Sequence, residues 1–323
     1  MVLITLVDLL FKMIARWDIH PMYFTCQAMI FGGFTLLTAS RPGPLGLETL
    51  RAPATWAYGL LFLCSNAIFI TSLIYLDIVT VNLITASSII VTFVMSFLFM
   101  GRNRFTYFRS LMLLIIGGGV AFIISQLAVD TQTIAVLVAI AFALAQTIRV
   151  FIQETHKTSI LAKDDFVTEC RVTGLTLGVT AVIFTISLSC LAYIGFATQN
   201  EILLKLVPSA EQIFSIESLF FAAFYGILLL STLRYMEFFW IKKIKAERFV
   251  LLMTILPVIT FGFEWLADLA GLISFAGLTW PQIIAGVAIV IAALGLEISE
   301  TREERRKQER VLPSETAQPP WKG

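Results

Sequence analysis

Ionisable side chains inside long apolar stretches are the residues of this sequence best suited to chemistry. Asp8 and Lys12 lie four residues apart in the first apolar stretch, and Gln146 and Arg149 lie three apart in the sixth. Either spacing puts both side chains on one face of a helix. Because a charge inside a bilayer costs about 3 kcal/mol on insertion scales, such a group normally faces a partner or a water-filled cavity. These residues are therefore the first candidates for a substrate site.

Each of these charged groups also has a structural interpretation. Asp8 precedes Lys12, the favourable order for a helical ion pair, so the two could simply neutralise each other. Lys12 could also extend toward the nearby membrane surface. Arg149 could reach the cytoplasmic interface in the same way, or it could bind a carboxylate or phosphate through two hydrogen bonds. In the second case the substrate would be an anion.

Two further apolar stretches carry charge. In the eighth, Arg234 and Glu237 are three residues apart and could pair as structural anchors, while the deeper Tyr225 is the better cavity candidate. In the ninth, Glu264 and Asp268 share a face. Glu264 could take up and release the proton that a proton-coupled carrier needs, or both acids could simply reach external water.

Uncharged amides complete the set of polar groups. Asn66 and Asn82 lie within the third and fourth stretches, where such groups often only hydrogen-bond neighbouring helices. The candidate substrate-binding residues are Asp8, Lys12, Asn66, Asn82, Gln146, Arg149, Tyr225 and Arg234, and the candidate proton-coupling residue is Glu264.

The composition predicts where these residues reside. With 58% hydrophobic and 14% charged residues and a mean hydropathy of +0.87, the chain is typical of an all-α polytopic membrane protein. Ten stretches are long enough, or nearly so, to cross a bilayer core of about 30 Å. They run over 2–15, 22–39, 55–76, 79–100, 107–127, 134–152, 172–196, 219–241, 249–267 and 281–296.

The cationic residues orient these ten stretches. Cation-rich short loops stay cytoplasmic during insertion. Only Arg16 and Lys205 fall in connectors on one side, and Lys12, Arg149 and Arg234 lie within stretches. Both termini are therefore expected in the cytoplasm, with the cell inner membrane as the host membrane. The cytoplasmic connectors hold Arg41, Arg51, Arg102, Arg104, Arg109, Lys157, Lys163, Arg171, Lys242, Lys243, Lys245 and Arg248, and the tail holds Arg302, Arg305, Arg306, Lys307, Arg310 and Lys322.

An internal repeat links the two halves. ASSIIVTF at 86–93 matches TILPVITF at 254–261, an offset of 168 residues, and each run is followed by a threonine that opens a further stretch, Thr106 and Thr279. Five stretches per half is an odd number, so the second half is expected to insert upside down relative to the first. Inverted repeats recur in secondary transporters, with the substrate site near the midplane.

The chain resembles the drug/metabolite transporter superfamily, EamA-like branch. The resemblance is carried by LLFKMIARWDIHP near the start, by LIYLDIVTVNLITASSIIVTFVMSFLFMG and by ILPVITF, and it covers nearly the whole chain. It implies ten helices in two inverted five-helix repeats, and Lys12 matches a lysine frequent in the family. A Gly-Glu pair common in each half is replaced by Gly101-Arg102 and Phe275-Ala276, which indicates a divergent branch whose substrate is not inferred from relatives.

We expect one transmembrane domain over 1–298, with repeats at about 1–128 and 133–298, and a charged cytoplasmic tail over 299–323. The expected function is secondary-active transport of a small metabolite, such as an amino-acid-like solute, an amine or another polar organic solute, by alternating access. Proton coupling and exchange both remain open. The alternative is a helical receptor or membrane-complex subunit that transports nothing.

Other function classes and partners are constrained by motifs. The sequence has no HExxH, GxSxG or GxxxxGK[ST] pattern, so an enzyme or an ATP-driven pump is not expected. Its four cysteines lack metal or disulfide spacing, and we expect no metal and no cofactor. The expected partners are a small-molecule substrate and the lipid bilayer, without nucleic acid, and a homodimer is one oligomeric state to test.

Overall fold

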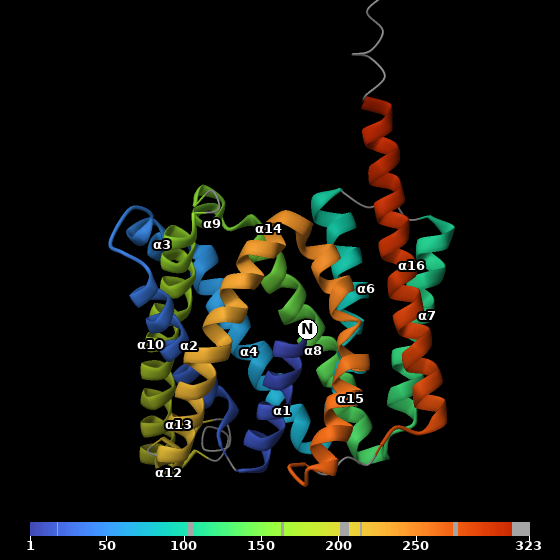
Figure 1. The fold of residues 1–323 in the computed structure, drawn as a ribbon. Helices are drawn as coiled ribbons and strands as arrows, with labels where there is room; N and C mark the ends of the chain where they lie inside the picture. Colours follow the sequence, from blue (N-terminus) through green and yellow to red (C-terminus); the bar gives the residue numbers. More distant parts are fainter. Residues whose placement is uncertain are drawn as a thin grey trace, which may run out of the picture.

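The computed structural model describes residues 1–17, 19–101, 106–162, 165–200, 207–213, 215–273 and 277–311. Throughout these residues the regular structure is helical, and the long helices run side by side in one bundle (Figure 1). Eight helices or continuous helix runs in this part of the chain are long and apolar enough to cross a bilayer, which fits an integral multi-pass membrane protein. They are Pro21–Ala39, Pro53–Tyr75, Ile78–Met100, Tyr107–Ser125, Val129–Leu161, Phe166–Thr198, Glu211–Met253 and Trp280–Ser299.

The first half of the chain forms seven helices and one π-helical segment. Pro21 and Pro53 begin two of the long helices, at a position where a missing N–H costs nothing. The Thr106 side chain accepts a hydrogen bond from the Arg109 N–H and caps a third. In order, the elements are α1 (Val2–Arg16), α2 (Pro21–Ala39), α3 (Gly46–Arg51), α4 (Pro53–Tyr75), α5 (Ile78–Thr85), α6 (Ser87–Met95), the π-helical segment η1 (Ser96–Met100) and α7 (Tyr107–Ser125).

The second half has a similar series of elements. Its longest apolar helix begins at an Asp165 cap, which accepts from the Thr168 N–H. The elements are α8 (Val129–Thr155), α9 (Lys157–Leu161), α10 (Phe166–Thr198), α12 (Ala210–Ile213), α13 (Ile216–Phe224), the π-helical segment η2 (Tyr225–Leu230), α14 (Ser231–Met253), α15 (Leu256–Leu269) and α16 (Trp280–Val311).

Two of the ten expected spanning stretches are interrupted. The stretch at 79–100 breaks at Ala86, between α5 and α6, and the stretch at 249–267 breaks at Thr254 and Ile255, between α14 and α15. Pro257 explains the second break, because it has no N–H to bond the carbonyl four residues earlier. At the first break, the Ser87 hydroxyl donates to the Ala139 carbonyl of α8 at 2.8 Å.

Two expected spans are shorter than a bilayer requires. α1 has 15 residues and α15 has 14, against about 20 for a helix that crosses the hydrocarbon core. α1 occupies the place of the first expected span, and α15 forms the larger part of the ninth, which begins within α14. The chain reverses direction inside α14 at Lys245, whose φ of 69° is non-helical, so this single run holds two antiparallel arms (Figure 1).

The bundle has two paired edges. α2 packs closely on α10 at one edge and α7 on α16 at the other, with α1, α4, α8 and the arms of α14 between them (Figure 1). Gly33 of α2 makes the first contact possible, since a Cβ at Gly33 would lie 2.5 Å from the backbone nitrogen of Gly178 in α10. The same Cβ would lie 2.9 Å from the carbonyl oxygen of Gly174, so small residues on both helices allow the close approach.

The cation-rich connectors gather at one end of the bundle. α3, α9 and the reversal in α14 lie at the same end as the extension of α16 (Figure 1). α16 continues to Val311, so the first part of the expected tail is helical. Residues 312–323 and the expected loop cations Arg102, Arg104, Lys163 and Lys205 lie outside the described residues.

Candidate substrate site

A cavity of about 340 Å³ lies inside the bundle. Its walls come from both halves of the chain, namely from α1, α4, α5, α6, α8, η2, both arms of α14 and the start of α15. The cavity collects seven of the nine candidate residues, and it leaves Lys12 and Glu264 outside its lining. The seven are Asp8, Asn66, Asn82, Gln146, Arg149, Tyr225 and Arg234.

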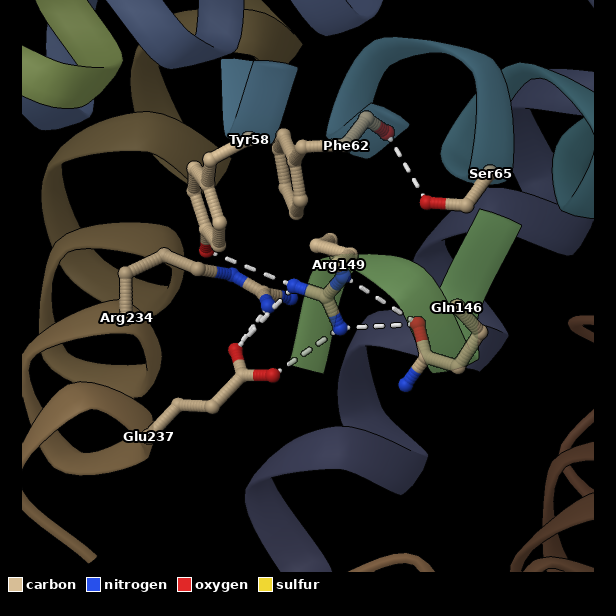
Figure 2. Close-up of polar contacts among 7 residues, drawn as sticks. All are labelled: Tyr58, Phe62, Ser65, Gln146, Arg149, Arg234 and Glu237. Atoms are coloured by element: carbon tan, nitrogen blue, oxygen red, sulfur yellow. Dashed lines mark hydrogen bonds and ion pairs between the residues drawn. The ribbon is translucent and has the colours of Figure 1, made fainter. Parts of the chain in front are cut away.

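Two arginines share one carboxylate at the wall formed by α8 and α14 (Figure 2). Arg149 donates from Nη2 to Glu237 Oε1 at 2.9 Å and from Nη1 to Glu237 Oε2 at 3.3 Å. Arg234 donates from Nη1 to the same Oε2 atom. The expected Arg234–Glu237 pair is confirmed, and it has a third member from α8.

The Arg149 side chain is held from several sides. Its Nε and Nη2 groups donate to Gln146 Oε1 at 3.2 and 2.8 Å, and Nη1 donates to the Tyr58 hydroxyl at 3.4 Å. The guanidinium carbon atoms of Arg149 and Arg234 lie 5.4 and 4.3 Å from the centre of the Phe62 ring (Figure 2). Arg149 is only 3% exposed, so the interpretation in which it extends to the membrane surface is wrong.

A second polar group lies on the wall formed by α1 and α5. Asn82 Nδ2 donates to Asp8 Oδ2 at 3.0 Å and to Thr260 Oγ1 of α15 at 3.2 Å. Nearby in the lining, Asn66 Nδ2 has no hydrogen-bond partner among the described residues. The alternative in which Asp8 pairs with Lys12 is wrong, because Lys12 bonds elsewhere.

Lys12 and Glu264 meet at the turn between α4 and α5. Lys12 Nζ donates to the carbonyls of Leu73 at 2.9 Å and Leu76 at 2.7 Å, and it lies 3.7 Å from the Asp77 carboxylate. Glu264 accepts from the first two N–H groups of α5 at 3.1 and 3.2 Å. Lys12 is 7% and Glu264 0% exposed, whereas Asp268 is exposed. Their position corrects the expectation that Lys12 lines the cavity.

Four aromatic side chains meet at the cavity wall. The rings of Phe11 and Tyr225 meet edge to face at 5.1 Å, and both line the cavity. Phe69 lies 6.2 Å from Phe11, and the fully buried Phe24 stacks on Tyr225 at 6.0 Å. These four rings form an aromatic layer, three of whose members line the cavity, and Lys12 follows Phe11 directly in the sequence.

Three residues of this arrangement were not among the sequence candidates. The sequence spacing predicts Glu237 only as a local partner of Arg234, Tyr58 resembles any aromatic residue in an apolar helix, and Asp77 falls in a connector. A polar residue in an apolar stretch is easy to recognise in the sequence. Its partner in another helix is not, because that pairing depends on how the helices pack. Among the described residues, no cluster of His, Cys, Asp and Glu could hold a metal ion.

Comparison with known proteins supports the fold alone. No protein-family model matches the chain, and no curated protein matches it. A solved structure, described only as a crystal structure of a protein, matches with a TM-score of 0.52 over 91% of this chain and 95% of the matched chain. The sequences are 17% identical, so the helical arrangement has a known counterpart and the activity does not follow from it.

Proposed function

We propose that the protein is a secondary-active carrier that moves a small polar organic solute by alternating access. The observation that carries the proposal is the charged cavity inside the bundle, lined by helices of both halves. Buried charges that face a cavity within membrane helices typically mark a substrate or ion pathway. In this proposal ten helices span the membrane as two inverted five-helix repeats of the drug/metabolite transporter type, with both termini in the cytoplasm.

Packing between equivalent elements supports the repeat. In an inverted repeat, helices at equivalent places in the two halves meet across a pseudo-two-fold axis. The second and seventh expected spans pack as α2 and α10, and the fifth and tenth as α7 and α16. The fourth and ninth also pack, α5 against α15 and α6 against α14.

A pair of side-chain contacts gives more specific support. The 168-residue offset of the sequence repeat relates Ser96 to Glu264 and Val79 to Glu247. The Ser96 hydroxyl donates to Glu247 Oε1, and the Val79 N–H donates to Glu264 Oε2 at 3.2 Å. The two contacts therefore join equivalent positions of the two halves, because exchanging each residue for its equivalent turns one contact into the other. A two-fold relation between the halves requires this.

Helix breaks supply further support. The interruptions at Ala86 and Thr254 are related by the same offset, and both residues line the cavity. Discontinuous helices at the midplane are characteristic of carriers, because backbone groups freed at the break can contact the solute. A receptor has no need for paired breaks at equivalent positions.

The closure of one end fits a carrier caught in a one-sided state. The Lys12–Asp77–Glu264 contacts join α1 and α15 to the α4–α5 turn, and Phe11 of the aromatic layer precedes Lys12 in α1. Movement of α1 and α15 away from the α4–α5 turn would open this end. We therefore assign Lys12 and Glu264 to an outer closure, with proton coupling through Glu264 left to the test below.

The test is transport by the purified protein in liposomes. Amino acids, amines, carboxylates, nucleosides and sugar phosphates are offered with and without a pH gradient. We expect saturable uptake of one class, with counterflow when the liposomes are preloaded with the same solute. A failure of every class to enter would favour the receptor or complex-subunit alternative.

A further inference from the structure

Arg149 and Arg234 carry two positive charges and share one carboxylate, that of Glu237. Glu237 is the one carboxylate among the described residues within 4.0 Å of either Arg149 or Arg234. The other acid in the cavity lining, Asp8, bonds Asn82 on the wall formed by α1 and α5. In addition, the Nε group of Arg234 is buried with no hydrogen-bond partner among the described residues. A cavity wall with two guanidinium groups and one carboxylate is suited to receive a second anionic group.

The guanidinium groups do not depend on Glu237 alone for their orientation. Gln146 accepts two hydrogen bonds from Arg149, and the Tyr58 hydroxyl contacts it from α4. The Phe62 ring lies within 5.4 Å of both guanidinium carbon atoms, close enough for a cation–π contact with each. If Glu237 bonded Arg234 alone, these contacts would still hold the Arg149 guanidinium in place for another ligand.

The geometry of the existing pair favours a carboxylate over other anions. Arg149 holds Glu237 through two separate N–H groups and two separate carboxylate oxygens, at 2.9 and 3.3 Å. This two-point contact matches the planar fork of a guanidinium to a planar carboxylate. The Glu237 contact thus shows that the Arg149 guanidinium accepts a planar carboxylate.

We propose that Arg149 and Arg234 form a carboxylate-binding subsite for a small organic monocarboxylate, with Glu237 as its internal competitor. When the solute carboxylate binds Arg149, Glu237 stays with Arg234 and each guanidinium has one carboxylate. The apolar body of the solute lies against Phe142 and Tyr225, which share the lining. This inference rests on the proposed carrier function, because it names the solute class of the same cavity.

The test compares four probes of similar size by isothermal titration calorimetry. The full-length protein is purified in detergent and held at pH 7 with constant chloride. The probes are 3-phenylpropanoate, its neutral amide 3-phenylpropanamide, phenethylamine and phenyl phosphate. We expect 3-phenylpropanoate to bind and the amide and amine to bind at least about tenfold more weakly, since a charge-assisted hydrogen bond contributes roughly 1.5–3 kcal/mol.

Three variants decide the role of each group. Arg149→Lys keeps the charge and loses the fork, so we expect about tenfold weaker binding of 3-phenylpropanoate. Glu237→Gln removes the competitor, so we expect binding to tighten by about tenfold, a gain that misfolding cannot produce. Arg109→Lys is the matched control, because Arg109 is a buried arginine of α7 outside the cavity lining.

Several outcomes would overturn the inference. These are an absence of carboxylate binding to both the natural protein and Glu237→Gln, equal binding of the amide, tighter binding of phenyl phosphate, or an equal loss in Arg109→Lys. The carrier proposal fails separately. Carboxylate binding without transport of any solute would contradict the carrier, whereas transport of another class without carboxylate binding would contradict only the subsite.

Discussion

Lys12 and Glu264 stabilise one turn by contacting opposite backbone charges. The Lys12 ammonium lies at the carbonyl end of α4, and the Glu264 carboxylate lies at the N–H end of α5. Each charge therefore complements the local helix dipole. Since the two residues come from α1 and α15, they join three separate segments of the bundle at one end.

Removal of either charge should impair transport without preventing membrane insertion. We expect Lys12→Met and Glu264→Gln each to slow uptake in liposomes at least about fivefold, because hydrogen bonds to charged groups contribute roughly 1.5–3 kcal/mol to the closed state. Asp268→Asn, an exposed acid one turn beyond Glu264, is the matched control. Uptake rates equal to those of the natural protein in both variants would rule out this role.

Gln146 should act by positioning Arg149. Gln146→Leu keeps the approximate volume and removes the oxygen that accepts two hydrogen bonds from Arg149. We expect KM for the transported solute to rise about tenfold with a smaller change in maximal rate, the cost of one to two charge-assisted bonds. An unchanged KM would show that Arg149 is oriented without Gln146.

The sequence predicts the members of the site better than their contacts. Arg149, Arg234, Tyr225 and Asp8 stand out because polar groups are costly inside apolar helices. The bridge from Arg149 to Glu237 spans 88 residues and depends on how α8 packs on α14. Helical spacing alone favours Asp8 as the partner of Lys12, but the fold brings the α4 carbonyls and Asp77 within its reach.

At the level of helices, the close α2–α10 contact depends on glycine at position 33. A methyl group on Gly33 would lie 2.5 Å from the Gly178 nitrogen and 2.6 Å from its Cα, so backbone would have to move. We expect Gly33→Ala to lower the thermal unfolding midpoint of the detergent-purified protein, by an overpacking cost of about 1–3 kcal/mol. Gly118→Ala of α7 is the control, because nothing lies within 4 Å of its added methyl group. Equal midpoints for the two variants would contradict the close contact.

Pro257 should matter for movement more than for stability. Pro257→Ala restores an N–H that can bond the carbonyl four residues earlier and so favours a continuous helix across Thr254. We therefore expect uptake to fall while the thermal midpoint is unchanged or higher, as measured in liposomes and in detergent. Faster uptake would indicate that the break is not needed for transport.

Hydropathy predicts the spanning stretches and misses these breaks. The mean hydropathy of an apolar window is the same whether or not the helix is interrupted at one residue. Hydropathy therefore gives no sign of the break at Ala86. Pro257 is a visible helix breaker, yet a proline is also tolerated within membrane helices. The shortness of α1, by contrast, follows from the limited apolar run around it.

At the scale of the whole molecule, the distribution of Lys and Arg predicts which connectors share one side of the membrane, and the arrangement of the bundle is compatible with that prediction. The connectors expected in the cytoplasm lie at one end, together with the α16 extension (Figure 1). The repeat offset of 168 residues, found in a short apolar run, also relates two buried contacts that sequence comparison cannot reveal. The sequence offers an anionic solute as one of two interpretations of Arg149, and the fold adds the Glu237 carboxylate that Arg149 and Arg234 share.

The most direct test of the central claim is solute counterflow in liposomes that contain the natural protein or Arg149→Lys. Liposomes preloaded with unlabelled solute from the class identified by the uptake screen receive the same solute in labelled form outside. The account predicts transient accumulation of label above equilibrium for the natural protein and a loss of at least about tenfold in Arg149→Lys. No accumulation by the natural protein with any class, or equal accumulation by both proteins, would contradict it.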